Sequence, residues 1–168
     1  SQLDEGGQLS AELVDLQDLA LETVRSLTEL AAGRNVTLTA VGTTAPMTGV
    51  RRLLAETVYN LCENAVKYNF DNGWVKVTLN ADHKFFYLRV ADSGVGIPEE
   101  LQDHIFERFY RVDKARSRET GGNGLGLAIT RNAILLHRGS IKVHSVEKQG
   151  TTFAVRIPLI YQAQGGNS

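Results

Sequence analysis

Two glycine-rich stretches decide how this chain folds: Asp92-Ser93-Gly94-Val95-Gly96-Ile97-Pro98 and Gly121-Gly122-Asn123-Gly124-Leu125-Gly126-Leu127. The run before the first stretch, residues 85–91, alternates well enough to predict a β-strand that places Asp92 at its end. The second stretch continues into apolar residues at helical spacing, so its backbone N–H groups lie at the start of a predicted helix. Together they predict a loop that closes over a ligand.

Each stretch has chemistry that suits a different part of a nucleotide. A carboxylate at Asp92 can accept a hydrogen bond from an amino group, while Gly94 and Gly96 let the backbone approach a planar ring such as adenine. Exposed N–H groups at a helix start favour phosphate. Alone, either stretch is just as typical of a tight loop, and neither a Walker P-loop nor a GxGxxG fingerprint occurs. Only their combination predicts ATP.

Length and composition set outer limits. With 168 residues, of which 42% are hydrophobic, we expect one domain with a sizeable core. The formal net charge of -1 gives no global field to attract nucleic acid or an anionic membrane, although local patches are compatible with it. The single cysteine, Cys62, fits a reducing cytosol. No apolar run reaches the roughly 18 residues of a membrane span, so we expect a soluble, cytoplasmic chain.

The segment 50–68 predicts an amphipathic helix with an unusual polar face. The apolar side carries Val50, Leu54, Val58, Leu61 and Ala65, and the opposite side carries Glu56, Asn60, Asn64 and Lys67. Two asparagines one turn apart sacrifice helix propensity. Their amide oxygens can coordinate Mg2+ with its waters, and Lys67 can meet a phosphate, although an ordinary solvated face explains the pattern equally well.

The remaining pattern predicts an α+β fold. We expect a two-layer α/β sandwich with a mixed, mostly antiparallel sheet and helices on one face. The expected elements are an extended entry at 11–16, a helix at 16–32 capped by Gly33, a strand at 35–41, a loop through Pro46 and Gly49, a hairpin of 74–80 with 85–91, a short helix from Pro98, a helix at 124–136 and a hairpin of 139–146 with 151–157.

Five motifs, in this order, resemble the catalytic ATP-binding domain of sensor histidine kinases, in the superfamily of gyrase, heat-shock chaperone ATPases and MutL. They are the N box at 60–68, the G1 box DSGVGIP, the F box FERFYRVDKARSR, the G2 box GNGLGLAI and the closing Gly150-Thr151-Thr152-Phe153. The resemblance covers about residues 11–158. It implies a Bergerat fold with a mobile ATP lid, preceded by a linker remnant at 1–10 and followed by a disordered tail at 161–168, with the domain itself at 11–160.

The resemblance also implies the site residues. Asn64 would be the principal Mg2+ ligand and Asn60 its helper, with Lys67 on phosphate and Tyr68 beside the nucleotide. Asp92 would bind the adenine amino group, Gly94 and Gly96 would shape the pocket, and Thr152 would support it. In the lid, Tyr110 and Arg111 would contact nucleotide, with Arg111 stabilising the γ-phosphate. The backbone of Gly124, Leu125 and Gly126, with Leu127 next to them, would cradle phosphates.

The lid segment between Phe106 and Thr120 carries five bases against three acids, too polar for a core. We expect it to be mobile until a polyphosphate neutralises it, with Phe106 and Phe109 as its apolar anchors. An amide at Asn60, where the related ATPases carry a glutamate, cannot act as a general base, so we expect slow ATP hydrolysis.

None of the four histidines has the setting of a phosphoacceptor, so the resemblance implies an upstream dimerisation and phosphoacceptor domain in the same full-length protein. A protein-histidine kinase would transfer the γ-phosphoryl group of ATP to that histidine, and then to an aspartate of a response regulator. The full-length protein would be a membrane-anchored homodimer and this piece a monomer. Two alternatives are an anti-sigma-factor-type serine kinase and a non-catalytic nucleotide-binding regulatory module.

Overall fold

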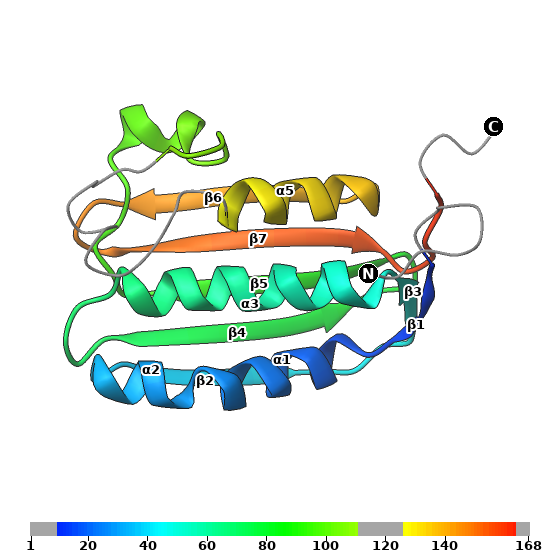
Figure 1. The fold of residues 1–168 in the computed structure, drawn as a ribbon, viewed down its shortest axis with the longest axis horizontal. Helices are drawn as coiled ribbons and strands as arrows, with labels where there is room; N and C mark the ends of the chain where they lie inside the picture. Colours follow the sequence, from blue (N-terminus) through cyan, green and yellow to red (C-terminus); the bar gives the residue numbers. More distant parts are fainter. Residues whose placement is uncertain (1–9, 111–125, 164–168) are drawn as a thin grey trace.

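The computed structural model describes residues 10–110 and 126–163, which form a two-layer sandwich (Figure 1). Its elements are β1 (Glu12–Val14), α1 (Leu16–Ser26), α2 (Thr28–Gly33), β2 (Thr37–Gly42), β3 (Met47–Gly49), α3 (Arg51–Lys67), β4 (Trp74–Ala81), β5 (Phe85–Asp92), the 3₁₀-helix η1 (Glu99–His104), α5 (Gly126–Leu136), β6 (Ser140–Val146) and β7 (Gly150–Pro158). The main sheet has the order β2-β4-β5-β7-β6.

The sheet confirms the predicted fold class. Only β2 and β4 run parallel, and each of the other neighbouring pairs is antiparallel, including both hairpins expected from the sequence. Alternate side chains point to one face and are buried there, as Phe86, Leu88 and Val90 are on β5. The helices α1, α3 and α5 lie over that face (Figure 1).

The central helix α3 packs one side against the sheet and carries the polar residues of interest on its other side. Its buried side chains are Leu53, Leu54, Thr57, Val58, Leu61, Cys62, Ala65 and Val66. Asn60 and Asn64 are half-buried rather than fully solvated. The predicted two-sided helix is therefore correct, and its polar side is partly shielded from water.

Two expectations about the first fifty residues were wrong. The helix expected at 16–32 is two helices, because the chain breaks at Leu27, which has φ -97° and ψ 4° and is 2% exposed. At this break Thr28 Oγ1 donates to the carbonyl oxygen of Val24 at 2.9 Å, a local bond that competes with helix continuation. The loop expected through Pro46 and Gly49 contains β3, which pairs with β1. A strand of three residues offers too little alternation to be recognised.

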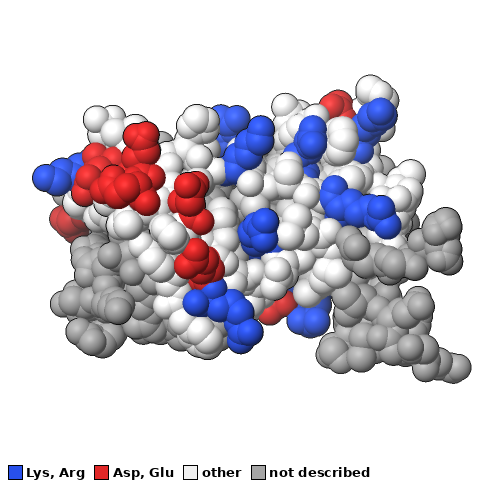
Figure 2. Space-filling model, turned by 90° about the horizontal axis from the view of Figure 1, so that it is seen from above, with Lys and Arg blue, Asp and Glu red and all other residues white. Residues whose placement is uncertain are grey.

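Charge is segregated although the net charge is near zero. Figure 2 shows acidic side chains gathered at the end of the molecule where η1 lies, with basic side chains spread along the rest of that face. The acids Glu99, Glu100, Asp103 and Glu107 are all exposed. The local patches that composition alone allowed are therefore present.

His137 fastens the end of α5 to the start of α3. It is 1% exposed, and its Nε2 accepts a hydrogen bond from the Val50 backbone N–H at 3.0 Å. Its Nδ1 must therefore carry the proton, which it donates to the Ala133 carbonyl oxygen at 2.8 Å. Burial holds the pKa of His137 below its ordinary value, although the bond to Ala133 opposes this shift.

The stability of the fold should therefore depend on His137 below about pH 6.5. The unfolded chain takes up a proton on this imidazole at a higher pH than the folded chain does, so stability is full above pH 6.5 and falls as the pH drops towards the lowered folded pKa. The difference in the free energy of urea unfolding between the wild type and His137→Gln should follow this slope, at most about 1.4 kcal/mol per pH unit, because all other titrating groups are common to both proteins. An NMR titration of the wild-type imidazole checks the same point independently of that variant: a midpoint at or above 6.5 would contradict it.

Candidate functional site

The end of β5, the end of α3 and the β6–β7 hairpin meet around the first glycine stretch. The Val95 N–H donates to the Tyr68 carbonyl oxygen at 3.0 Å, which joins the stretch to the last turn of α3. On the other side, the Lys148 N–H donates to the Val95 carbonyl oxygen at 2.6 Å, and the Ile97 N–H donates to Ser145 Oγ at 2.7 Å. The stretch is thus fixed from two sides.

Two glycines make this close packing feasible. A β-carbon at Gly94 would collide with the Tyr68 carbonyl oxygen and would lie 2.9 Å from Asp92 Oδ1. Gly96 has φ +71°, in the left-handed region, and a β-carbon there would collide with the Val146 carbonyl oxygen. Both glycines are therefore required by the backbone itself, beside any ligand that the stretch holds.

Asp92 has the electrostatics of a binding group. Its Oδ1 accepts hydrogen bonds from the Gly94 N–H at 2.8 Å and from the Thr151 N–H at 3.2 Å. Burial raises the pKa of Asp92 to about 6, and these two bonds only partly oppose the shift. Among the described residues no hydrogen bond reaches Oδ2, so this oxygen can accept a proton donor from a ligand, such as an exocyclic amino group.

Asn69 is a structural part of the site that sequence reasoning missed. It is 2% exposed, and its Oδ1 accepts from the Phe70 N–H at 2.8 Å and from Ser93 Oγ at 3.1 Å. Its Nδ2 donates to the Trp74 carbonyl oxygen at 3.0 Å. These bonds tie the α3–β4 turn to the first glycine stretch. In the sequence this asparagine looks like any other turn residue, so no signal distinguished it.

Of the two adjacent threonines on β7, the structure places Thr151 next to Asp92, whereas the sequence analysis had named Thr152. Thr151 pairs directly with Asp92 across the strands, is 6% exposed and shares a hydrogen bond of 2.8 Å with Ser145 Oγ. Thr152 pairs with Ala91, so its side chain lies on the opposite face of the sheet. A strand pattern fixes the alternation of faces but not which face meets the ligand.

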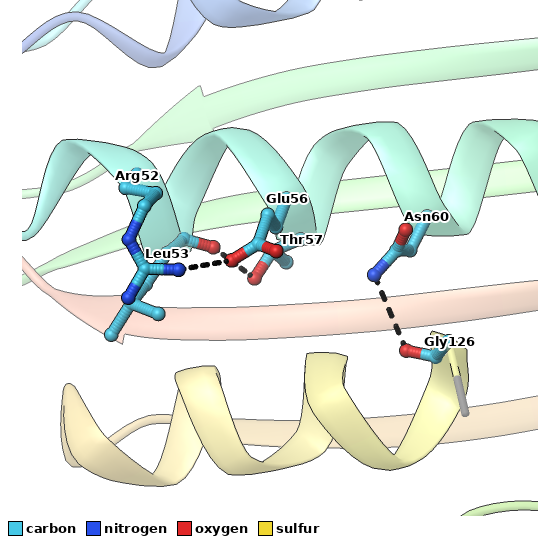
Figure 3. Close-up of polar contacts among 6 residues, drawn as sticks. All are labelled: Arg52, Leu53, Glu56, Thr57, Asn60 and Gly126. Carbon is cyan, nitrogen blue, oxygen red and sulfur yellow. Dashed lines mark hydrogen bonds and ion pairs between the residues drawn. The ribbon is translucent and has the colours of Figure 1, made fainter. Parts of the chain in front are cut away.

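The polar face of α3 lies against the start of α5. Asn60 Nδ2 donates to the Gly126 carbonyl oxygen at 3.4 Å (Figure 3). Glu56, one turn earlier on the same face, pairs with Arg52 at 3.0 Å rather than with the asparagines (Figure 3). Asn64 is half-buried, and the ammonium of Lys67 lies 3.6 Å from Glu63 Oε2. Asn60, Asn64 and Lys67 therefore share one face, which is linked to the Asp92 stretch through Tyr68.

Part of the expected lid lies outside the described residues, including Arg111, Gly124 and Leu125. Tyr110 stacks on the ring of His104 with centroids 5.5 Å apart. Phe106 packs edge-on against Phe153 at 6.3 Å, as an apolar anchor should. Phe109 does not: it is 63% exposed with φ +65° and lies under the guanidinium of Arg108. Its place in a tight turn, which spacing alone did not show, keeps it out of the core.

The described residues fit a nucleotide and a hard cation. The backbone around Gly94 leaves no room for a side chain, and the half-buried Asp92 offers an acceptor beside it. On α3, two amide side chains and an ammonium group share one partly shielded face, and amide oxygens are among the ligands that Mg2+ accepts. An α/β sandwich with a site of this kind is typical of nucleotide-binding domains.

Comparisons with known proteins agree. Residues 49–160, more than half of the chain, match the family model described as histidine kinase-, DNA gyrase B-, and HSP90-like ATPase. The chain therefore belongs to that family. Sensor histidine kinase RppB of Synechocystis sp. is 38% identical over 146 residues, which are 86% of this chain and 32% of RppB. Signal transduction histidine-protein kinase ArlS of Staphylococcus aureus is 52% identical over 93 residues, 55% of this chain and 21% of ArlS.

The solved structures point the same way. Full-length ShkA in complex with AMPPNP superposes with a TM-score of 0.79 at 25% identity, covering 97% of this chain and 33% of ShkA. The resemblance to the ATP-binding domain of sensor histidine kinases is thus confirmed, and the chain spans a third or less of the length of these three proteins. Within the described residues, no helix combines the length and apolarity needed to cross a membrane.

Because the site holds a half-buried carboxylate, Asp92→Asn should stabilise the nucleotide-free chain near neutral pH. The folded pKa of about 6 lies above the ordinary value of 3.8, so protonation of Asp92 favours the folded state. This contribution is full below about pH 4 and is lost as the pH rises through 6, which leaves an ionised carboxylate that opposes folding at pH 7.5.

Urea unfolding should therefore show a gain of about 1 to 2 kcal/mol for Asp92→Asn at pH 7.5 and little gain at pH 4. The amide keeps an oxygen for the Gly94 and Thr151 N–H groups, so the native contacts are retained. The exposed Asp18, in the first turn of α1, supplies the control variant Asp18→Asn. An equal effect of Asp92→Asn at the two pH values would contradict the raised pKa.

Proposed function

We propose that this chain is the catalytic ATP-binding domain of a two-component sensor histidine kinase, with the domain itself at residues 11–160. The observation that carries the proposal is Asp92, half-buried at a strand end with one oxygen bonded to two backbone N–H groups and the other available. In this role Asp92 accepts a hydrogen bond from the adenine amino group, Gly94 and Gly96 shape the pocket, and Tyr68 lies beside the nucleotide.

The phosphate half of the site is assigned to α3 and α5. Asn64 is the principal Mg2+ ligand, and Asn60 assists it. The half-buried position of both amides on one face of α3 supports this assignment. When bound, Mg2+ offsets the negative charge of the phosphates. Lys67 adds a cation one turn beyond Asn64, and Gly126 and Leu127 lie at the start of α5. In this proposal Gly124, Leu125 and Arg111 complete the phosphate contacts, and Tyr110 contacts the nucleotide.

The chemistry assigned to these residues is phosphoryl transfer, which depends on positioning and on offsetting charge. Lys67 and Arg111 stabilise the transferring group while the asparagines orient it towards an incoming histidine nitrogen. An amide at position 60 cannot activate water as a general base, so the site favours transfer over hydrolysis. Asn60 already donates to the Gly126 carbonyl oxygen, which holds its side chain towards α5.

The whole protein extends the proposal. The relatives RppB and ArlS are several times longer than their matched parts and are named as histidine kinases. By analogy, a dimerisation domain of the same protein supplies the phosphoacceptor histidine, and a response regulator receives the phosphoryl group on an aspartate. We place the domain in the cytoplasm, within a homodimeric parent that is anchored in the bacterial membrane.

Calorimetric titration with ATP tests the function directly. The chain should bind ATP saturably and more tightly with Mg2+, and Asp92→Asn should weaken binding by at least tenfold, because an amide Nδ2 facing the adenine amino group replaces an acceptor with a donor. Asp18→Asn should bind like the wild type. A folded wild-type chain that binds no ATP would contradict the proposed function.

The two threonines of β7 give a matched pair. Thr151→Val removes the hydroxyl that holds Ser145 Oγ next to Asp92, so the site is less well supported and the ATP dissociation constant should rise by up to about tenfold, the most that one lost hydrogen bond usually costs. Thr152→Val, on the other face of the same strand, should leave it unchanged. The opposite ranking in the same titration would restore Thr152 as the supporting residue.

A further inference from the structure

Lys67 is engaged by another side chain of α3. Its Nζ lies 3.6 Å from Glu63 Oε2, and the same oxygen accepts a hydrogen bond from the Tyr59 hydroxyl at 3.2 Å. Tyr59, Glu63 and Lys67 follow one another at intervals of four residues and so form a stripe along the helix. This stripe borders the asparagines of the proposed phosphate site.

The Glu63–Lys67 pair is better shielded than the other two Arg or Lys pairs found among the described residues. The side chains of Lys67 and Glu63 are 18% and 31% exposed, whereas Arg52 and Glu56 are each 42% exposed and Arg51 and Glu22 are 40% and 52% exposed. Solvent and salt therefore screen the Glu63–Lys67 pair less. Burial and the neighbouring carboxylate raise the pKa of Tyr59, so its hydroxyl remains a donor to Glu63 at neutral pH.

We propose that Glu63, held by Tyr59, is a built-in competitor of the nucleotide phosphates for Lys67. The inference rests on the proposed function, because it concerns the lysine assigned to phosphate there. An incoming phosphate meets an ammonium group that already faces a carboxylate, and it brings further negative charge close to that carboxylate. Glu63 thus weakens the binding of phosphate-bearing ligands and has no effect on the nucleoside part.

A positioning role for Glu63 predicts the opposite sign. A carboxylate that held the Lys67 side chain in place for phosphate would improve binding. A single partly exposed ion pair between residues one helical turn apart, however, restricts the lysine side chain only weakly. The Glu63 carboxylate repels each negative charge of the nucleotide phosphates, so this repulsion grows with the number of phosphate groups. The electrostatic competition should therefore outweigh the ordering.

The test compares adenosine with ADP, both without Mg2+, on the 168-residue chain and on Glu63→Gln. Gln removes the charge and keeps an oxygen for the Tyr59 hydroxyl. Calorimetry at low salt should show ADP binding about threefold to tenfold tighter in Glu63→Gln, and adenosine binding unchanged. Unchanged or weaker ADP binding would overturn the inference, and weaker binding would identify Glu63 as a positioning residue.

Two further variants make the readout specific. Glu56→Gln removes a carboxylate two turns earlier on α3 that pairs with Arg52 instead, and it should change ADP binding far less. In a Lys67→Met background the gain from Glu63→Gln should largely disappear, because the competition acts through Lys67. A gain that persists in full there, or an equal gain in Glu56→Gln, would show general electrostatics and overturn the inference.

The failure modes are distinguishable. If the wild-type chain bound neither ADP nor adenosine while giving a cooperative thermal unfolding transition, the proposed function and this inference would fall together. If ADP bound the wild type and Glu63→Gln alike, only the inference would fall. Thermal unfolding of each variant separates lost binding from lost fold.

Discussion

Asp92 is a carboxylate that the backbone holds partly out of water at the end of β5. Its two hydrogen bonds come from Gly94, two residues on, and from Thr151 on the neighbouring strand β7, so one side chain joins the glycine turn to the sheet. The glycine turn also passes very close to the Tyr68 carbonyl oxygen, which only glycine at position 94 allows. The geometry of the site therefore depends on this carboxylate and on the turn that surrounds it.

The glycine stretch around Asp92 is held mainly by hydrogen bonds of its own backbone. Main-chain groups of Val95 and Ile97 bond to the β6–β7 hairpin, and the Val95 N–H donates to the Tyr68 carbonyl oxygen at the end of α3. Asn69, buried in the turn after α3, connects the remaining side to Ser93 and Trp74. A region held by backbone hydrogen bonds has few rotatable parts, so the proposed nucleoside site would order few side chains on binding.

The sequence was sufficient for the fold class and for the order of the motifs, because period-two and period-3.6 patterns and glycine positions are local signals. It was insufficient where a local signal is short or ambiguous. The break at Leu27 and the three-residue strand β3 leave no distinct period in the sequence, and the exposed Phe109 depends on a turn that spacing does not reveal. The choice of Thr151 over Thr152 needed the register of β5 with β7, a contact between distant residues.

The two halves of the proposed site differ in how they are held. Around Asp92 the contacts are backbone hydrogen bonds, which fix position, whereas around Lys67 the contact is one ion pair between side chains, which a ligand can exchange. A rigid half suits the nucleoside, which is the same in every adenine nucleotide. An exchangeable half suits the phosphate chain, whose length and charge change during phosphoryl transfer. The helix α3 serves both halves. The carbonyl oxygen of Tyr68, its C-cap residue, accepts a hydrogen bond from the glycine turn, and its polar face carries Lys67.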